Sequence, residues 1–281
     1  MKTHGTLHIP FLVGWLLATS VSAATVDGIH LHSSVSGKGP RTVILVHGWT
    51  CDDRTWKQQV PVLSENHRVI TLDLPGHGQS GSPKDGKLSM DLFARAVEAV
   101  RREQKADRVV LVGHSMGAAV VMQYARRYPE HTVGLVFVDG SVTIPQEAAG
   151  RMLSAAKQYG ESLKAREAMV QAMFTASTTA EVRKQVLSMI LGTPAATPLA
   201  AMEAFADPAG WKDDVFTQPV LAVYAEGSLA AGDRESDDQY MRRRFPRLDR
   251  VKMTGTGHFL MLEKPAEFNR LLASFLDKLE Y

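Results

Sequence analysis

Continuous apolar runs rich in β-branched residues recur along the first half of the chain. Four of them stand out, at residues 42–48, 68–76, 108–114 and 133–140. Such runs are typical of strands that are buried on both faces, as in a parallel sheet. The pattern returns at 219–227 and, more weakly, at 248–255.

Helical patterns separate several of these runs. Within 91–102, one apolar stripe is formed by Leu92, Phe93, Ala96, Val97 and Val100. The chain ends in a second amphipathic pattern, carried by Phe268, Leu271, Leu272, Phe275, Leu276 and Leu279. The alternation of strands and helices predicts an α/β fold with a doubly wound, mostly parallel sheet.

The alternation stops between residues 144 and 210, where almost the whole sequence has a helical pattern. Because this segment is inserted between two strands of one sheet, we expect a helical cap at their carboxyl edge. The predicted core is therefore divided into residues 24–143 and 211–281. The cap segment holds five methionines, a residue type that suits both an adaptable apolar pocket and the packing of the cap's own helices: Met152, Met169, Met173, Met189 and Met202.

The N-terminus has the features of a signal peptide. Lys2 precedes a short apolar run at 9–18, and small residues follow up to Ala23. The run is too short for a comfortable membrane span. We expect residues 1–23 to be removed by cleavage after Ala23, which predicts a secreted or periplasmic protein without a stable membrane anchor.

Composition restricts the partners and cofactors. A chain of 281 residues with a formal net charge of +2 gives no electrostatic reason to expect nucleic acid. The densest basic cluster, residues 241–245, is interpreted as a solvated helix face. Cys51 is the single cysteine and is expected to be a small buried hydrophobe. No metal site or cofactor is predicted, and no feature indicates an oligomeric state.

A serine stands between two glycines where a predicted strand gives way to a helix. Residues 113–117 read Gly-His-Ser-Met-Gly and fit the G-x-S-x-G pattern in the context that the pattern requires. A sharp turn holds such a serine in a strained conformation, and side chains at Gly113 and Gly117 would clash. This arrangement predicts that Ser115 is a nucleophile at the sheet edge.

A reaction at a carbonyl also needs two N–H donors for the oxyanion. The backbone of Met116 is the first candidate, because it directly follows the serine at a helix N-terminus. The second candidate is the backbone N–H of Trp49, which follows a strand ending in His47-Gly48. The indole of Trp49 can pack in the core while its amide faces the site.

Four motifs in order resemble those of the α/β-hydrolase superfamily, in its serine-nucleophile, esterase-like branch. They are His-Gly-Trp at 47–49, residues 73–80, the serine turn at 113–117, and residues 255–268. By resemblance, His258 occupies the position of the general base, and the titration of histidine near neutrality suits that role. His77, His47 and His114 are instead expected to serve turn and backbone geometry.

The acid departs from the commonest family pattern. Relatives usually carry Asp in the turn at 225–228, where this chain has Ser228. Asp139, at the end of an earlier strand, is our first candidate, because haloalkane dehalogenases and some lipases look similar in placing their acid there. Glu226 and Asp233 remain alternatives, and Asp139 could also simply begin an Asp-Gly turn.

The nucleophile limits the reaction. The dehalogenase and epoxide-hydrolase branches use Asp at the turn, so Ser115 indicates acyl transfer. We expect hydrolysis of carboxylic esters of small to medium, largely apolar substrates. Amidase, lactonase and C–C bond hydrolase activities need the same constellation, and a receptor-like ligand-binding protein is the alternative of another class. Fold alone does not decide among them.

Overall fold

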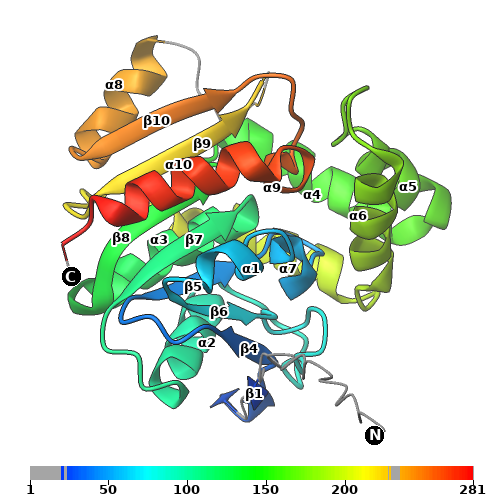
Figure 1. Cartoon of the computed structure of the whole chain (residues 1–281). Coiled ribbons are helices and arrows are strands. Elements are labelled where there is room, and N and C mark those ends of the chain that lie inside the picture. Colours follow the sequence, from blue (N-terminus) through cyan, green and yellow to red (C-terminus); the bar gives the residue numbers. More distant parts are fainter. Residues whose placement is uncertain (1–19, 22–23, 227, 229–234, 281) are drawn as a thin grey trace, which may run out of the picture.

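The computed structural model describes residues 20–21, 24–226, 228 and 235–280. Its centre is an eight-stranded sheet in the order β1-β4-β6-β5-β7-β8-β9-β10 (Figure 1). The strands are β1 (Ser20–Val21), β4 (Ser33–Ser36), β6 (Arg68–Leu72), β5 (Thr42–Val46), β7 (Val109–His114), β8 (Thr132–Val138), β9 (Val220–Ala225) and β10 (Leu248–Met253). From β6 to β10 all neighbours are parallel, and β1 and β4 are antiparallel at one edge. The predicted doubly wound, mostly parallel sheet is confirmed.

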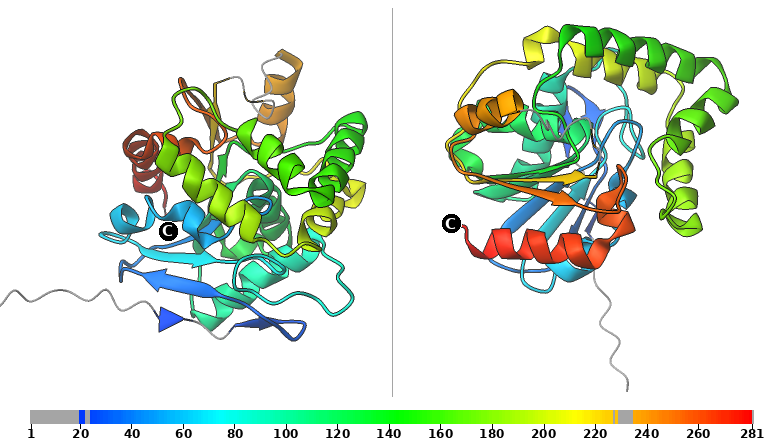
Figure 2. Two further views of the ribbon diagram at one scale, coloured as in Figure 1. Left: turned by 90° about the vertical axis from the view of Figure 1, so that its right-hand side faces the viewer. Right: turned by 90° about the horizontal axis from the view of Figure 1, so that it is seen from above.

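The central strands are apolar because helices cover both of their faces. Every residue of β5, β7, β8 and β9 is buried. α2 (Met90–Glu103) and α3 (Met116–Arg127) pack against each other on one face. α1 (Val60–Leu63), α9 (Leu260–Glu263) and α10 (Pro265–Asp277) lie on the opposite face (Figures 1 and 2). β7 ends at His114 as predicted, whereas the other predicted strands end two to four residues early, in loops that contribute to the site described below.

Four helices stand between β8 and β9 and form the cap. They are α4 (Gln146–Glu161), α5 (Leu163–Gln171), α6 (Ala180–Gly192) and α7 (Thr197–Ala206). Figure 1 shows them beside the carboxyl ends of the parallel strands. The cap is tied to the loops after β5 and β6: Trp49 Nε1 donates to Pro198 O at 2.8 Å, and Thr197 Oγ1 donates to Gly76 O at 2.6 Å.

A two-stranded hairpin and a late helix had no clear signal in the apolar pattern. The hairpin pairs β2 (Thr25–Val26) with β3 (Ile29–His30), and the helix is α8 (Glu235–Arg244). The expectation of a solvated basic face on this helix is wrong for Arg244, which is 1% exposed. Arg242 and Arg243 are exposed as expected. Arg244 differs because the last turn of α8 directs it toward α3, where its Nη2 lies 3.8 Å from Met122 Sδ.

Two further predictions concern the N-terminus and Cys51. Apart from residues 20–21, the predicted signal peptide lies outside the described residues, so its cleavage stays a prediction. Within the described residues no single helix is long and apolar enough to cross a membrane; only α6 and α7 taken together meet the criterion, as a pair bent by 93°. Cys51 is buried and unpaired, and burial raises the pKa of its thiol to about 12.

Candidate active site

Ser115 occupies a strained turn between β7 and α3. Its φ is +53°, a left-handed conformation that non-glycine residues rarely adopt. A Cβ on Gly113 would lie 2.3 Å from Gly117 O, and one on Gly117 would lie 2.5 Å from Val46 O. The glycines on either side are therefore required by the close approach of the backbone, and the N-terminus of α3 points into the same region.

A second strained turn follows the neighbouring strand. Asp139 comes directly after β8 with a φ of +45°, and its N–H donates to Val223 O at 2.8 Å. A Cβ on the next residue, Gly140, would lie 2.3 Å from Ala118 Cβ and 2.7 Å from Ser115 O. The turn that carries Asp139 thus packs directly against the turn that carries Ser115.

His258 comes from the loop after β10 and contacts Asp139. Its Nδ1 lies 2.7 Å from Asp139 Oδ2, while Ala225 N–H donates to Asp139 Oδ1 at 2.9 Å. The Asp139 side chain is 5% exposed and the His258 side chain is 25% exposed. The acid is therefore enclosed, whereas the imidazole remains open to the cavity.

Opposing effects act on the pKa of Asp139. Burial raises it, but the hydrogen bond and charge of His258, together with hydrogen bonds from the Ser228 hydroxyl and the Ala225 N–H, outweigh burial. The pKa of Asp139 lies below its usual range, so the group is a carboxylate at neutral pH. A carboxylate accepts only, so His258 carries its proton on Nδ1 and keeps Nε2 as the basic nitrogen.

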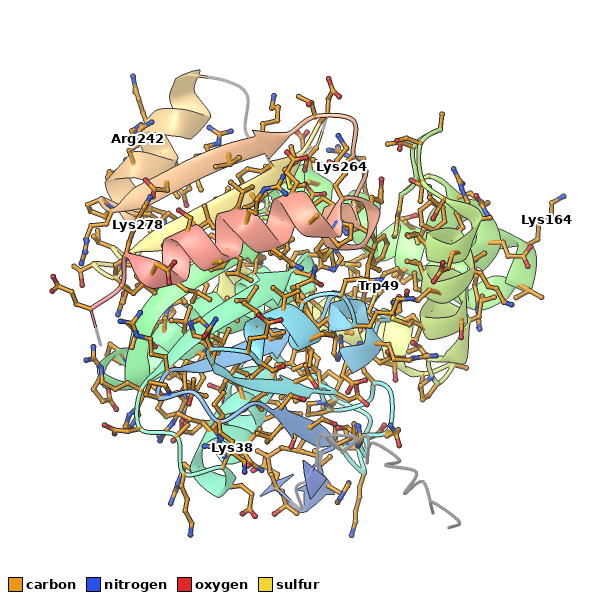
Figure 3. The ribbon with its side chains drawn as sticks, in the orientation of Figure 1. Lys38, Trp49, Lys164, Arg242, Lys264 and Lys278 are labelled. Atoms are coloured by element: carbon orange, nitrogen blue, oxygen red, sulfur yellow. The ribbon has the colours of Figure 1, made fainter. Side chains whose placement is uncertain are left out.

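The two predicted oxyanion donors line the cavity that contains Ser115 and His258. In the described part of the chain, neither the Trp49 nor the Met116 backbone N–H has an acceptor within the protein. Figure 3 labels Trp49 where the core meets the cap, and its indole is fixed there by Pro198 O. The indole is thus held by the cap, and the role of the Trp49 amide in an oxyanion hole stays a prediction.

Comparison with known proteins identifies the family. Residues 43–271 match the alpha/beta hydrolase family. The chain belongs to this family. A solved thermophilic esterase from Thermogutta terrifontis has a TM-score of 0.81 and 25% identity, over 93% of this chain and 98% of its own. The 2-(acetamidomethylene)succinate hydrolase of Mesorhizobium japonicum is 27% identical over 90% of this chain and 93% of its own.

Other curated relatives match over part of this chain only. The dihydrolipoyllysine-residue acetyltransferase component of the acetoin cleaving system of Cupriavidus necator is 34% identical over 121 residues, which are 43% of this chain and 32% of that protein. The chain spans about a third of the length of several such relatives. Their likeness covers less than half of this chain.

The cavity has a volume of about 470 Å³ and an apolar wall supplied largely by the cap. Four of the five cap methionines contribute to this wall, as do two phenylalanines: Met152, Met169, Met173, Met202, Phe174 and Phe205. Met189 is buried elsewhere, 3.8 Å from Thr55 Oγ1. Both interpretations of the methionines therefore hold, four lining the cavity and one packing the cap against the core.

Of the two alternative acids, Glu226 is among the described residues, and its hydrogen bond there is not to His258. Glu226 lines the cavity, but it is exposed, and its Oε2 accepts the Gly255 N–H at 2.8 Å. Asp233 lies outside the described residues. Ser228, which replaces the acid of the commonest pattern, instead donates its hydroxyl to Asp139. The sequence analysis did not predict the contact between Ser228 and Asp139. The only indication of it in the sequence was a serine at the position where relatives usually carry the acid.

His114 has a larger role than the turn geometry expected from the sequence. It is 1% exposed, and its Nε2–H donates to His258 O at 2.9 Å. Burial, assisted by the nearby His258, lowers the pKa of His114 to about 3, so the ring is neutral at pH 7. A second contact fixes the same loop, because His258 N–H donates to Met173 O in the cap at 3.1 Å.

One group of possible metal ligands occurs among the described residues. Ligand atoms of His32, Asp53 and Asp73 lie within 4.8 Å of one another, away from the cavity. Both oxygens of Asp73 already accept backbone N–H groups, from Asp53 and Gln79, at 2.8 Å each. The Asp73 carboxylate thus joins the segment that begins at Asp53 to the loop that carries Gln79.

Proposed function

We propose that the protein hydrolyses carboxylic esters through an acyl-enzyme formed on Ser115. The observation that carries the proposal is the 2.7 Å contact between His258 Nδ1 and Asp139, at the edge of a cavity that Ser115 also lines. A base oriented by a carboxylate, beside a serine on a strained turn, is the arrangement that activates a hydroxyl for acyl transfer.

The proposed reaction proceeds in two similar halves. Nε2 of His258 takes the proton of Ser115 as Oγ attacks the ester carbonyl, and the oxyanion accepts N–H donors from Trp49 and Met116. The imidazolium, stabilised by Asp139, then protonates the departing alcohol. Water repeats the sequence on the acyl-enzyme, releasing the carboxylic acid and restoring Ser115.

The cavity wall supports a largely apolar acyl group of small to medium size. Methionine side chains are flexible and polarizable, so such a wall adapts to more than one acyl shape. The likeness to a solved esterase at 25% identity, over nearly the whole chain, is consistent with this substrate class. Lactones, amides and C–C bonds would pass through the same intermediates and serve as comparison substrates.

Labelling with a fluorophosphonate tests the nucleophile. Wild-type protein should react rapidly, and Ser115→Ala should lose both labelling and turnover of p-nitrophenyl acetate, butyrate and octanoate. The variant should stay folded, because removing one hydroxyl at the cavity edge leaves little empty core volume. A residual rate on the order of 10³-fold above water can survive, because the oxyanion donors remain.

Two outcomes would contradict the proposal. Wild-type turnover in a contamination-free preparation of Ser115→Ala would exclude Ser115 as the nucleophile. A folded wild-type protein that binds esters but is not labelled would favour the receptor-like alternative. A matched lactone or anilide turned over at least a hundred times faster than every ester would move the assignment to that bond.

A further inference from the structure

The turn at 225–228, which has Ser228 at the position of the usual acid, contacts the proposed acid, Asp139. Ser228 N–H donates to Ala225 O at 3.3 Å, which closes the turn after β9. From this turn, the Ala225 N–H donates to Asp139 Oδ1 at 2.9 Å, and the Ser228 hydroxyl donates to the same carboxylate. Two donors from four residues of β9 and its turn thus converge on Asp139.

We infer that Ser228 is a positioning residue, and that its side chain stands where a carboxylate would also reach His258. The inference rests on the proposed function. Ser228 and Asp139 line the same cavity as His258, although they come from different strands. Since parallel strands β8 and β9 are neighbours, their carboxyl ends bring both residues to the cavity that His258 also lines.

The hydroxyl has a defined task in the proposed reaction. The Asp139 carboxylate is enclosed, and a buried charge is stable only when its oxygens are hydrogen-bonded. His258 Nδ1 uses Oδ2 and Ala225 uses Oδ1. The third donor, Ser228, limits rotation of the carboxylate away from His258, and it keeps the group ionised when His258 becomes an imidazolium.

The first test removes and restores the hydroxyl. Ser228→Ala should lower kcat for a p-nitrophenyl ester about tenfold, a change of about 1.4 kcal/mol in the barrier. KM should change less than twofold, because the lost contact is to the acid. Ser228→Thr, which keeps a hydroxyl, should recover most of the lost kcat. Circular dichroism and thermal midpoints establish equal folding of the compared variants.

The second test moves the carboxylate between the two strands. Asp139→Asn should lose several orders of magnitude in kcat. Adding Ser228→Asp to it should restore at least tenfold, whereas adding Ser228→Asn, the matched uncharged control, should restore nothing. Ser228→Asp alone places a second negative charge beside His258. It should therefore move the acidic limb of the kcat/KM profile to higher pH, a shift that a merely structural role would not produce.

The outcomes separate this inference from the proposed function. A labelled, active wild type with unchanged kcat in Ser228→Ala, or with no recovery in Asp139→Asn/Ser228→Asp, would overturn the inference alone. Absence of labelling in the wild type would overturn the proposed function and the inference with it. Should Ser228→Ala fail to fold, the comparison of Ser228→Asp with Ser228→Asn in the Asp139→Asn background decides the question.

Discussion

At the scale of single residues, two of the proposed catalytic residues have a strained backbone conformation. Ser115 and Asp139 both have positive φ and directly follow neighbouring strands. Such conformations cost on the order of 1–3 kcal/mol each and persist only where the surroundings enforce them. Here the enforcement is mutual, because Gly140 fits closely against Ser115 O and Ala118. The two turns therefore keep each other in place.

The identity of the acid is the first prediction at this scale. Asp139→Asn should lower kcat by about 10⁴, because an amide cannot stabilise the imidazolium and favours the wrong tautomer of His258. Glu226→Gln should change kcat less than about tenfold, since Glu226 holds the Gly255 N–H and does not contact His258. Ester turnover is measured at equal folded fraction. A larger loss in Glu226→Gln than in Asp139→Asn would assign the acid to the later strand.

A second prediction concerns pH and the buried His77, whose ring is fully enclosed and bonded to Pro75 O at 3.1 Å. Burial, and then the nearby His47, lowers its pKa from 6.5 to about 3. Between these pH values the unfolded chain binds a proton that the folded chain does not. The free energy of unfolding should therefore fall with falling pH, by about 1.4 kcal/mol per pH unit from this group.

Urea unfolding at pH 4.5, 5.5 and 7 measures this dependence. His77→Gln, with no titrating ring, should show a shallower decline than the wild type by about that amount per pH unit. His114 adds a decline of the same sign in both proteins. If the free energy of unfolding depended on pH equally in the wild type and in His77→Gln, His77 would be protonated in the folded protein at mildly acidic pH.

At the scale of elements, Arg244 at the end of α8 joins both ends of the cap insertion to the core. Its guanidinium donates to Val142 O at 2.7 Å, before the cap, and to Lys212 O at 2.7 Å and Asp214 O at 3.1 Å, after it. Aromatic rings cover the same group, with Phe245 centred 5.4 Å away. One buried cation thus fixes the two segments between which the cap is inserted.

Replacing Arg244 should lower the free energy of unfolding substantially. Arg244→Met should lower the free energy of unfolding by roughly 3 kcal/mol, because three carbonyls lose a charged donor in a buried site. Arg243→Met, one residue earlier on the same turn, removes an exposed ion pair with Asp213 and a contact with the Tyr240 ring, and should cost less than about 1 kcal/mol. Urea unfolding compares the two variants. Equal losses would show that Arg244 does not anchor these segments.

Elements whose periodicity reflects burial could be predicted from the sequence. The parallel strands, α2, α10 and the cap all follow from it, and Ser115, His258 and Asp139 follow from motifs and strand ends. Arg244 could not be predicted, because three consecutive arginines look alike until packing selects one. The contacts of His114 with His258 and of Ser228 with Asp139 could not be predicted either, since each joins residues that lie far apart in the chain.

At the scale of the whole molecule, the cap and the core share the site. The cap supplies most of the apolar wall, and its Met173 carbonyl also holds the backbone of the proposed base, His258. Loosening of the cap would therefore affect both substrate binding and the orientation of the imidazole. The site depends on the complete assembly of the two parts.

Export is the prediction that belongs to the whole molecule. Small residues at Val21-Ser22-Ala23 favour cleavage after Ala23, so the exported protein should begin at or near Ala24. N-terminal sequencing of protein recovered outside the cytoplasm measures this directly. Exported material that still begins at Met1 would exclude cleavage.

The contact between Asp139 and His258 also has a consequence for biosynthesis. Ser115 and Asp139 directly follow adjacent strands that the ribosome makes before the cap, whereas His258 comes after the last strand, β10, and before α9 and α10. Proteins emerge from the N-terminus onward and their domains fold as units. A nascent chain would therefore contain Ser115 and Asp139 before it contains the proposed base, His258. Under the proposed mechanism, hydrolysis would begin only once the C-terminal segment has been synthesised and has docked.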